Sequence, residues 1–380
     1  MTDRKKLAVA HPALCGNEKK YVLECLETGW ISSIGRFIGL FEEQFAAYCG
    51  SEYAVACSNG TCALHLALAA LGVGPGDEVI VPTLTYIASA NAVTYCGARP
   101  VFVDSQDGTM NIDPNLIARH ITTRTKAIIA VHLYGHPSDM DAILNIAREH
   151  GLAVIEDAAE SHGALYKGRR TGSLADIAAF SFYGNKIVTT GEGGMVTCSD
   201  RALEDKLRML RGQGMDPRQR YWFPIVGYNY RMTNVAAAIG VAQLEQIDKL
   251  LERRFDIASE YRKRLAPYED LIQLPAEESW ARHAFWAYTV VLREAVNFDR
   301  DEIMRRLADD GIETRPVFYP MHVLPPYLEE RAVRYPVADR LSQRGIMLPM
   351  HTLLDDEDVD YIASRLVHWC KARLSSATAR

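Results

Sequence analysis

Residues 152–157 read LAVIED and residues 177–186 read IAAFSFYGNK, two apolar runs that each lead into a charged side chain. Runs of this kind, without polar alternation, indicate strands buried on both faces of a parallel sheet. They predict an α/β fold with a largely parallel sheet, in which ligands bind beyond the carboxyl ends of the strands. Similar runs, separated by helical stretches, are YAVAC (53–57), EVIVP (78–82), RPVFVD (99–104), KAIIAVHLYG (126–135) and GGMVTC (193–198).

The pattern changes after the last of these strands. One long helix is predicted at about residues 235–265, and we expect it to link a large domain, residues 1–250, to a smaller α+β domain, residues 251–380. A helix near residues 16–29 is expected to pack with the smaller domain. Strand and helix patterns that fit the smaller domain lie at residues 285–292, 299–311 and 356–370.

Composition excludes several classes of protein. The net charge is −6, with both signs mixed along the chain, so no basic face invites nucleic acid or an anionic membrane. No apolar run approaches the roughly 20 residues that span a bilayer, and the N-terminus lacks the apolar core of a secretory signal. The eight cysteines form no C-x-x-C pair, which favours reduced thiols and a cytoplasmic location.

The first candidate binding feature is Ser58-Asn59-Gly60-Thr61, between the strand at 53–57 and an apolar helix. Backbone N–H groups at a helix N-terminus bind phosphate, and glycine lets the backbone approach closely. An ordinary helix cap explains the same residues and stays open as an alternative.

Asp157 ends one buried strand, and Lys186 lies just past another. A carboxylate at such a strand end requires a cation, which a pyridinium nitrogen or a structural arginine would supply. A desolvated lysine can form a Schiff base, whereas an exposed loop lysine has no such role. Ser181 adds a hydroxyl near Lys186, and the glycine-rich residues 189–194 predict a hairpin or bulge. A phosphate seat, a carboxylate and a lysine in this order match the phosphate, ring nitrogen and aldehyde of pyridoxal phosphate.

Five motifs occur in order along the chain: Ser58–Thr61, Pro82–Tyr86, Glu156–Glu160, Phe180–Phe182 with Asn185-Lys186, and Gly227–Thr233. With these motifs the chain resembles the fold-type-I nucleotide-sugar aminotransferases of the DegT/StrS-type family over residues 10–370. The resemblance implies the aspartate-aminotransferase-like fold with a seven-stranded sheet, bound pyridoxal 5'-phosphate, glutamate as amino donor, and a homodimer with shared active sites.

The resemblance also implies roles for individual residues. Lys186 would hold the cofactor covalently and move protons, Asp157 would keep the ring nitrogen protonated, and Tyr86 would lie on the ring. Asn229 would reach the phosphate of the neighbouring subunit; a structural role in a tight turn is the alternative for this residue. The full cofactor-binding set is Ser58, Gly60, Thr61, Tyr86, Asp157, Glu160, Ser181, Lys186 and Asn229.

Three further segments resemble those of family members that aminate C4 of GDP-4-keto-6-deoxymannose: Trp30–Ser33, Arg211–Pro217 with Tyr221–Pro224, and Arg315–His322. Their arginine, histidine and aromatic side chains suit a diphosphate and a flat base, although aromatic residues beside proline also build rigid core corners. We therefore expect a nucleotide 4-keto-6-deoxy sugar as acceptor, and among these GDP-4-keto-6-deoxymannose, with amination at C4. The candidate substrate-binding residues are Trp30, Ser32, Arg211, Tyr319 and His322.

Other functions fit the sequence less well. Amination of a UDP- or dTDP-linked keto sugar stays open, because no sequence rule distinguishes the bases. A sugar dehydratase on the same scaffold is disfavoured by the presence of Lys186. A DNA-binding regulator would need a helix-turn-helix module or basic stripe. No metal ligands are expected, since the histidines lack ligand spacing. A nicotinamide enzyme is disfavoured, because the sequence lacks the G-x-G-x-x-G motif.

Overall fold

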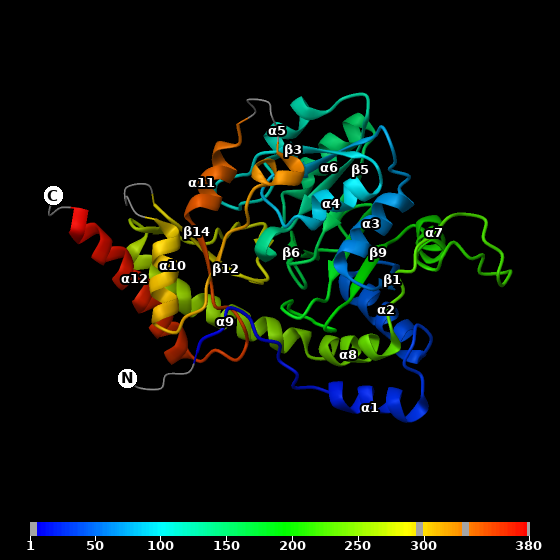
Figure 1. Ribbon diagram of the computed structural model, residues 1–380, viewed down its shortest axis with the longest axis horizontal. Coiled ribbons are helices and arrows are strands. Elements are labelled where there is room, and N and C mark those ends of the chain that lie inside the picture. Colours follow the sequence, from blue (N-terminus) through cyan, green and yellow to red (C-terminus); the bar gives the residue numbers. More distant parts are fainter. Residues whose placement is uncertain (1–5, 294–298, 329–333, 378–380) are drawn as a thin grey trace.

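A computed structural model describes residues 6–293, 299–328 and 334–377 (Figure 1). Its centre is a seven-stranded sheet in the order β1-β9-β8-β5-β4-β2-β3. β9 is antiparallel to β1 and β8, and the other pairings are parallel, which confirms the predicted sheet. The strands are β1 (Tyr53–Cys57), β2 (Glu78–Pro82), β3 (Arg99–Val103), β4 (Thr125–Val131), β5 (Ala153–Asp157), β8 (Ile177–Ser181) and β9 (Gly194–Cys198).

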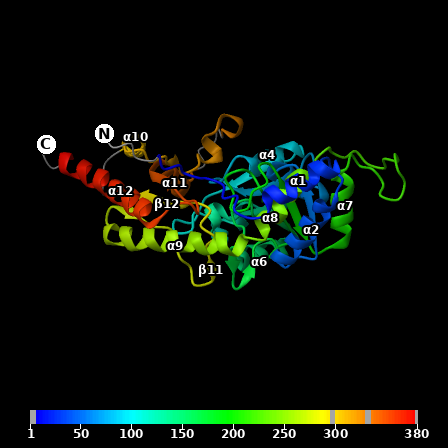
Figure 2. The same cartoon turned by 90° about the horizontal axis from the view of Figure 1, so that it is seen from below.

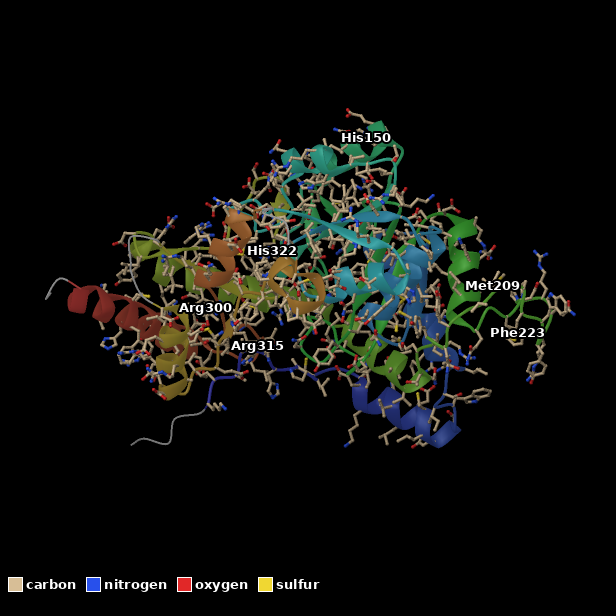
Figure 3. The ribbon with its side chains drawn as sticks, turned by 45° about the horizontal axis from the view of Figure 1, so that its top comes forward. His150, Met209, Phe223, Arg300, Arg315 and His322 are labelled. Atoms are coloured by element: carbon tan, nitrogen blue, oxygen red, sulfur yellow. The ribbon has the colours of Figure 1, made fainter. Side chains whose placement is uncertain are left out.

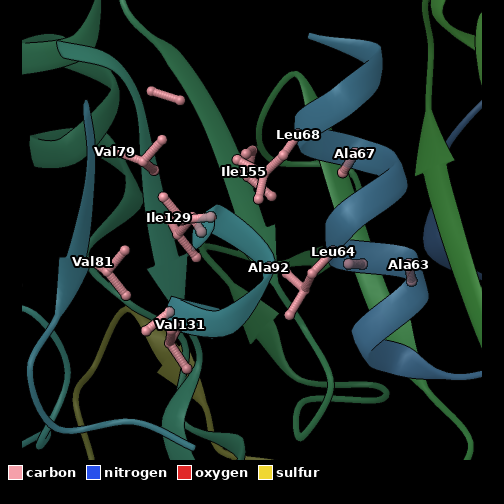
Figure 4. Packing of buried hydrophobic residues seen from close by; sticks show 14 of the residues in the cluster. Ala63, Leu64, Ala67, Leu68, Val79, Val81, Ala92, Ile129, Val131 and Ile155 are labelled. Carbon is pink, nitrogen blue, oxygen red and sulfur yellow. The ribbon is translucent and has the colours of Figure 1, made fainter. Parts of the chain in front are cut away.

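Helices bury both faces of this sheet. Side chains alternate along each strand, so that Val79 of β2 joins one core cluster and its neighbour Ile80 joins another. α3, α4 and α7 cover the first face, where Leu64 of α3 packs with Ile129 and Ile155 (Figure 4). α2, α6 and α8 cover the second face. Their bounds are α2 (Arg36–Cys49), α3 (Gly60–Ala70), α4 (Ala88–Tyr95), α6 (Met140–His150), α7 (Arg201–Arg211) and α8 (Asn234–Leu244), with the short α5 at Pro114–Ile117.

A second, antiparallel sheet in the order β10-β12-β14-β13 forms the smaller part of the molecule. α9, α10 and α12 pack around it and share a separate hydrophobic core. Figure 2 shows α10 and α12 at one end of the molecule and the loop after α7 at the other. The bounds are α9 (Ile247–Leu265), β10 (Ile272–Gln273), β12 (Tyr288–Leu292), α10 (Arg300–Asp309), β13 (Arg315–Pro316), α11 (Pro336–Arg344), β14 (Gly345–Leu348) and α12 (Asp356–Ala377); a third, small sheet contains β6 (Leu165–Tyr166), β7 (Arg169–Arg170) and β11 (Ala281–Arg282).

Two expectations about the helices need correction. The single helix predicted at residues 235–265 is two helices, α8 and α9, which meet at Glu245 and Gln246. α1 (Glu18–Thr28) packs on α8 and not with the smaller part (Figure 1). Polar contacts add to the apolar packing that holds α1 in this place. The Gln243 amide donates to Glu18 over 2.6 Å, and the Tyr21 hydroxyl donates to Glu245 over 2.7 Å. Helices α2, α7 and α11 were not predicted from the sequence.

The division at residues 1–250 and 251–380 stays a prediction. Its boundary falls inside α9, and Leu7, near the start of the chain, bridges to Ile312 and belongs to the core of the smaller part. Within the described ranges, no helix combines the length and apolarity that crossing a membrane requires.

Candidate active site

The strand ends that the sequence singled out meet at one cavity of about 640 Å³. β5 ends at Asp157, and β8 ends at Ser181. Only Ser58 and Asn59 separate the end of β1 from the start of α3 at Gly60. The cavity lies between these ends and the smaller part of the molecule, which contributes residues such as Trp286 and Phe318 to its wall. Of the predicted cofactor-binding residues, those that line the cavity are Gly60, Thr61, Tyr86, Asp157, Glu160, Ser181 and Lys186.

The start of α3 forms a seat for an anion. The side chain of Asn59 accepts from the N–H of Cys62 over 2.9 Å and caps the helix. The N–H groups of Gly60 and Thr61 precede the first intrahelical bonds, so they are available to a ligand. A Cβ on Gly60 would lie 2.6 Å from Cβ of Ser181, so glycine lets the seat and that serine share one wall. Ser58 does not line the cavity, and its N–H donates to the carbonyl of Tyr230.

Asp157 is buried at the end of β5. The Ser89 hydroxyl donates to its Oδ2 over 2.7 Å, and the N–H of Ala159 donates to its Oδ1 over 3.2 Å. Burial raises the pKa of the carboxyl, and the Ser89 hydrogen bond opposes this. Among the described residues Asp157 makes no salt bridge within 4 Å, unlike Glu42, which Arg208 and Arg211 neutralise. The structural salt bridge considered as its alternative is therefore absent from the described part of the chain.

Lys186 is a buried lysine, with a side chain that is 11% exposed. Its Nζ lies 3.6 Å from Oε1 of Glu160 and 4.1 Å from the centroid of the Trp286 indole. Burial lowers the pKa of this amine, while the nearby carboxylates of Glu160 and Asp157 raise it. A lysine in such surroundings is more readily deprotonated than a surface lysine and can react as a nucleophile.

Glu160 completes the charged cluster. Its Oε2 accepts from the N–H of Tyr134 over 2.8 Å, and burial raises the pKa of its carboxyl to about 7. Tyr86 lies at the cavity wall; the residue is 58% exposed, and its ring lies 5.6 Å from the ring of Phe318. Its exposed face is available for an aromatic ring.

Several other predicted residues do not reach this cavity. The guanidinium of Arg211 donates to Glu42 and to the carbonyl of Ala56, both over 2.7 Å, so it joins α7 to α2 and β1. Both ring nitrogens of His322 are occupied, Nδ1 by Thr83 at 2.7 Å and Nε2 by Asp339 at 3.0 Å. Neither side chain lines the cavity, and a substrate role for Arg211 and His322 stays a prediction.

The remaining predicted residues are exposed. Trp30 and Ser32 hold Asn234 only through their backbone carbonyls. Tyr319 lies at a separate hollow beside α10 and α11. Asn229 is exposed and forms a bridge with Gly212 at the base of the loop between α7 and α8. Figure 3 labels Phe223 in the projecting part of this loop.

Sequence reasoning missed part of the cavity wall. Trp286, Phe318 and Arg315 line it, yet only Arg315 and Phe318 lay in a segment noted for its composition. Trp286 had been assigned to a strand pattern, and its contact with Lys186, a hundred residues earlier, leaves no local signal. Figure 3 shows Arg315 and His322 on the smaller part of the molecule.

Comparisons with known proteins agree with this geometry. The family model described as DegT/DnrJ/EryC1/StrS aminotransferase family matches residues 12–367. The chain belongs to the DegT/DnrJ/EryC1/StrS aminotransferase family. It is 55% identical to GDP-perosamine synthase of Caulobacter vibrioides, covering 96% of this chain and 99% of the relative. It is 49% identical to GDP-perosamine synthase of Escherichia coli O157:H7, covering 95% and 98%. The PMP-form of Spr1654 from Streptococcus pneumoniae matches with a TM-score of 0.93 at 30% identity, covering 98% and 100%.

The cofactor of this aminotransferase is pyridoxal 5'-phosphate. The residues present fit it: the free N–H groups of α3 suit its phosphate, and the buried Asp157 without a salt-bridge partner suits a ring cation. The side-chain oxygen of Asn185, in the cavity wall, is buried and lacks a hydrogen-bond partner. When bound, the cofactor supplies an electron sink that stabilises negative charge on the substrate carbon. Within the described residues, no cluster of three or more His, Cys, Asp or Glu side chains is placed to hold a metal ion.

Proposed function

We propose that this aminotransferase moves an amino group from glutamate to C4 of GDP-4-keto-6-deoxymannose, giving GDP-perosamine and 2-oxoglutarate. The observation that carries the proposal is the full-length similarity, at 55% and 49% identity, to two relatives named GDP-perosamine synthase. The buried pair of Lys186 and Glu160, with Asp157 beside them, supports transamination as the chemistry. The cytoplasmic location stays a prediction.

We propose the following division of labour in the cavity. Gly60, Thr61 and Ser181 bind the cofactor phosphate, Asp157 holds the proton of the ring nitrogen, and Tyr86 covers the ring. Nζ of Lys186 carries the cofactor between turnovers and moves the proton between donor and acceptor carbons. The carboxylate of Glu160 completes the surroundings of the cofactor, whereas Ser58 lies outside the cavity and supports the seat through its backbone.

The expected substrate preference is testable by competition. GDP-4-keto-6-deoxymannose is offered together with UDP- and dTDP-linked 4-keto-6-deoxyglucose, in the presence of pyridoxal phosphate and glutamate, and the products are measured by mass spectrometry. A site that hydrogen-bonds guanine leaves polar groups unpaired when a pyrimidine occupies it, which costs about 10⁴–10⁵-fold in kcat/KM in the best-matched sites. We expect the GDP sugar to be aminated first.

The competition also separates the substrate from the chemistry. If the GDP sugar is the poorest of the three, the proposed substrate is wrong while the aminotransferase activity stands. The alternative, amination of a UDP- or dTDP-linked ketone, then takes its place. A product that has lost a hydroxyl without gaining nitrogen would instead indicate a dehydratase.

We further propose a homodimer with shared active sites. The loop between α7 and α8 projects from the body and exposes Tyr221, Trp222 and Phe223 (Figure 3). Exposed apolar side chains grouped in this way are typical of protein interfaces. Asn229 lies at the base of the same loop and would reach the phosphate seat of the partner, while Trp30, Ser32 and Tyr319 would face substrate in the assembled site.

Subunit mixing tests the shared site. Lys186→Ala and Asn229→Ala chains, each with little activity alone, are mixed and allowed to exchange. A hybrid dimer has one site with both residues intact, and half of randomly mixed dimers are hybrids, so we expect about a quarter of wild-type activity to return. Activity that stays at the level of the separate variants, despite subunit exchange shown by differently tagged chains, would place Asn229 outside the shared site.

A further inference from the structure

Tyr134 lies directly after β4 in an unusual backbone conformation. Its φ is 57°, in the left-handed region that bulky side chains rarely adopt, and the residue is almost completely buried. Strain of this kind persists only where surrounding contacts fix it, and it is concentrated at functional sites. The contacts of Tyr134 therefore indicate what the strain serves.

The backbone of Tyr134 contacts the charged cluster. Its N–H donates to Oε2 of Glu160 over 2.8 Å, while Oε1 of the same carboxylate lies 3.6 Å from Nζ of Lys186. The carbonyl of Tyr134 accepts from Ala287 over 3.3 Å, and the next carbonyl, that of Gly135, accepts from Ala284 over 2.9 Å. The turn at residues 134–135 thus joins the large sheet to the segment that carries Trp286.

The side chain of Tyr134 reaches the opposite wall of the cavity. Its hydroxyl accepts from the N–H of Phe318 over 3.0 Å. Its ring lies 5.2 Å from the ring of Phe318 and is nearly parallel to that of Trp286, at 6.2 Å. Phe318 and Arg315 line the cavity from the smaller part, whereas Lys186 lines it from the large sheet.

We propose that Tyr134 is a positioning residue whose N–H orients the Glu160 carboxylate toward Lys186 while its hydroxyl fixes the Phe318 segment at the facing wall. One residue thereby holds both the lysine's ion-pair partner and the wall that faces the substrate. The role rests on Lys186 acting as proposed above, although neither of its two contacts depends on which sugar is bound.

The electrostatic consequence concerns the lysine nitrogen. A carboxylate at this distance favours the protonated form of the nitrogen. Asp157 acts in the same direction. His162, packed nearby, remains neutral because burial lowers its pKa to about 3, and burial raises the pKa of the Tyr134 phenol, which also remains neutral. Loss of the Glu160 charge should therefore lower the pKa of the Lys186 nitrogen, whereas loss of the Tyr134 hydroxyl should leave that pKa unchanged.

Tyr134→Phe tests the hydroxyl in the holoenzyme, without substrate. The ring and the backbone N–H remain, but the N–H of Phe318 loses its acceptor. We expect hydrogen exchange of the Phe318 amide to become about tenfold faster, consistent with the loss of one hydrogen bond to a partly buried donor. The matched control is Tyr288→Phe, since no residue in the described part of the chain forms a hydrogen bond with the buried Tyr288 hydroxyl; it should leave this amide unchanged.

Glu160→Gln tests the charge. We expect the pH at which the visible absorption of the lysine-bound cofactor changes to fall by about one unit or more, and to stay at the wild-type value in Tyr134→Phe. Wild-type exchange at Phe318 in Tyr134→Phe overturns the proposal. So does an unchanged midpoint in Glu160→Gln, or an equal shift in both variants. These readouts use no sugar, so a wrong GDP-sugar assignment would not affect them.

Discussion

Lys186→Ala is expected to lose turnover almost completely. The amine is the buried nucleophile of the cavity. Its removal eliminates both the covalent bond to the cofactor and the group that moves the proton. Loss of proton transfer alone typically costs about 10²–10⁴-fold in kcat, and loss of covalent catalysis adds to this. The measurements are steady-state turnover with glutamate and the keto sugar, and borohydride reduction followed by mass spectrometry of the peptide.

A surface lysine provides the matched control. Lys167 pairs with Asp141 on the outside of the molecule, and both side chains are more than half exposed. Lys167→Ala should therefore retain wild-type turnover and the borohydride-stable adduct. Normal turnover in Lys186→Ala, or an adduct that persists on another peptide, would remove Lys186 from the proposed mechanism.

The strand ends could be predicted from the sequence, because burial on both faces requires continuous apolar runs. A charged residue that ends such a run is conspicuous. Asp157 and Lys186 could be identified on this basis. The residues around them could not be identified in this way. Trp286 is a hundred residues from Lys186, and its contact with the amine depends on how the smaller part folds back. The contact between Glu160 and Lys186 likewise depends on tertiary structure.

Residues chosen for their type alone have partners that the sequence does not indicate. Arg211 was chosen as a cation for a diphosphate, but Glu42, 169 positions earlier, takes its guanidinium. His322 was chosen for the same reason, and Thr83 and Asp339 occupy its ring. Such pairings are long-range, so neither composition nor spacing indicates them. The break between α8 and α9 was missed because Glu245 and Gln246 are good helix formers, and packing overrides their propensity.

Asp157→Asn is expected to bind the cofactor and yet turn over slowly. Asparagine has nearly the same shape: its oxygen can accept from the N–H of Ala159, and its amide nitrogen can donate to the Ser89 hydroxyl, so the end of β5 should keep its geometry. The phosphate seat and Lys186 are unchanged, which predicts normal cofactor stoichiometry by absorbance. The variant lacks the negative charge that keeps a ring nitrogen protonated, and a neutral ring withdraws electrons poorly.

We therefore expect kcat of Asp157→Asn to fall by about 10²–10³-fold, the usual effect of removing one preorganised charge interaction from a buried site. Asp113→Asn is the control: Asp113 caps the short helix α5 at the surface, and asparagine caps helices equally well. Since Asp157 has no salt-bridge partner among the described residues, a structural role predicts little effect on turnover, because no cation would be left unpaired. Wild-type kcat in Asp157→Asn with bound cofactor would thus show that the carboxylate does not act on the ring.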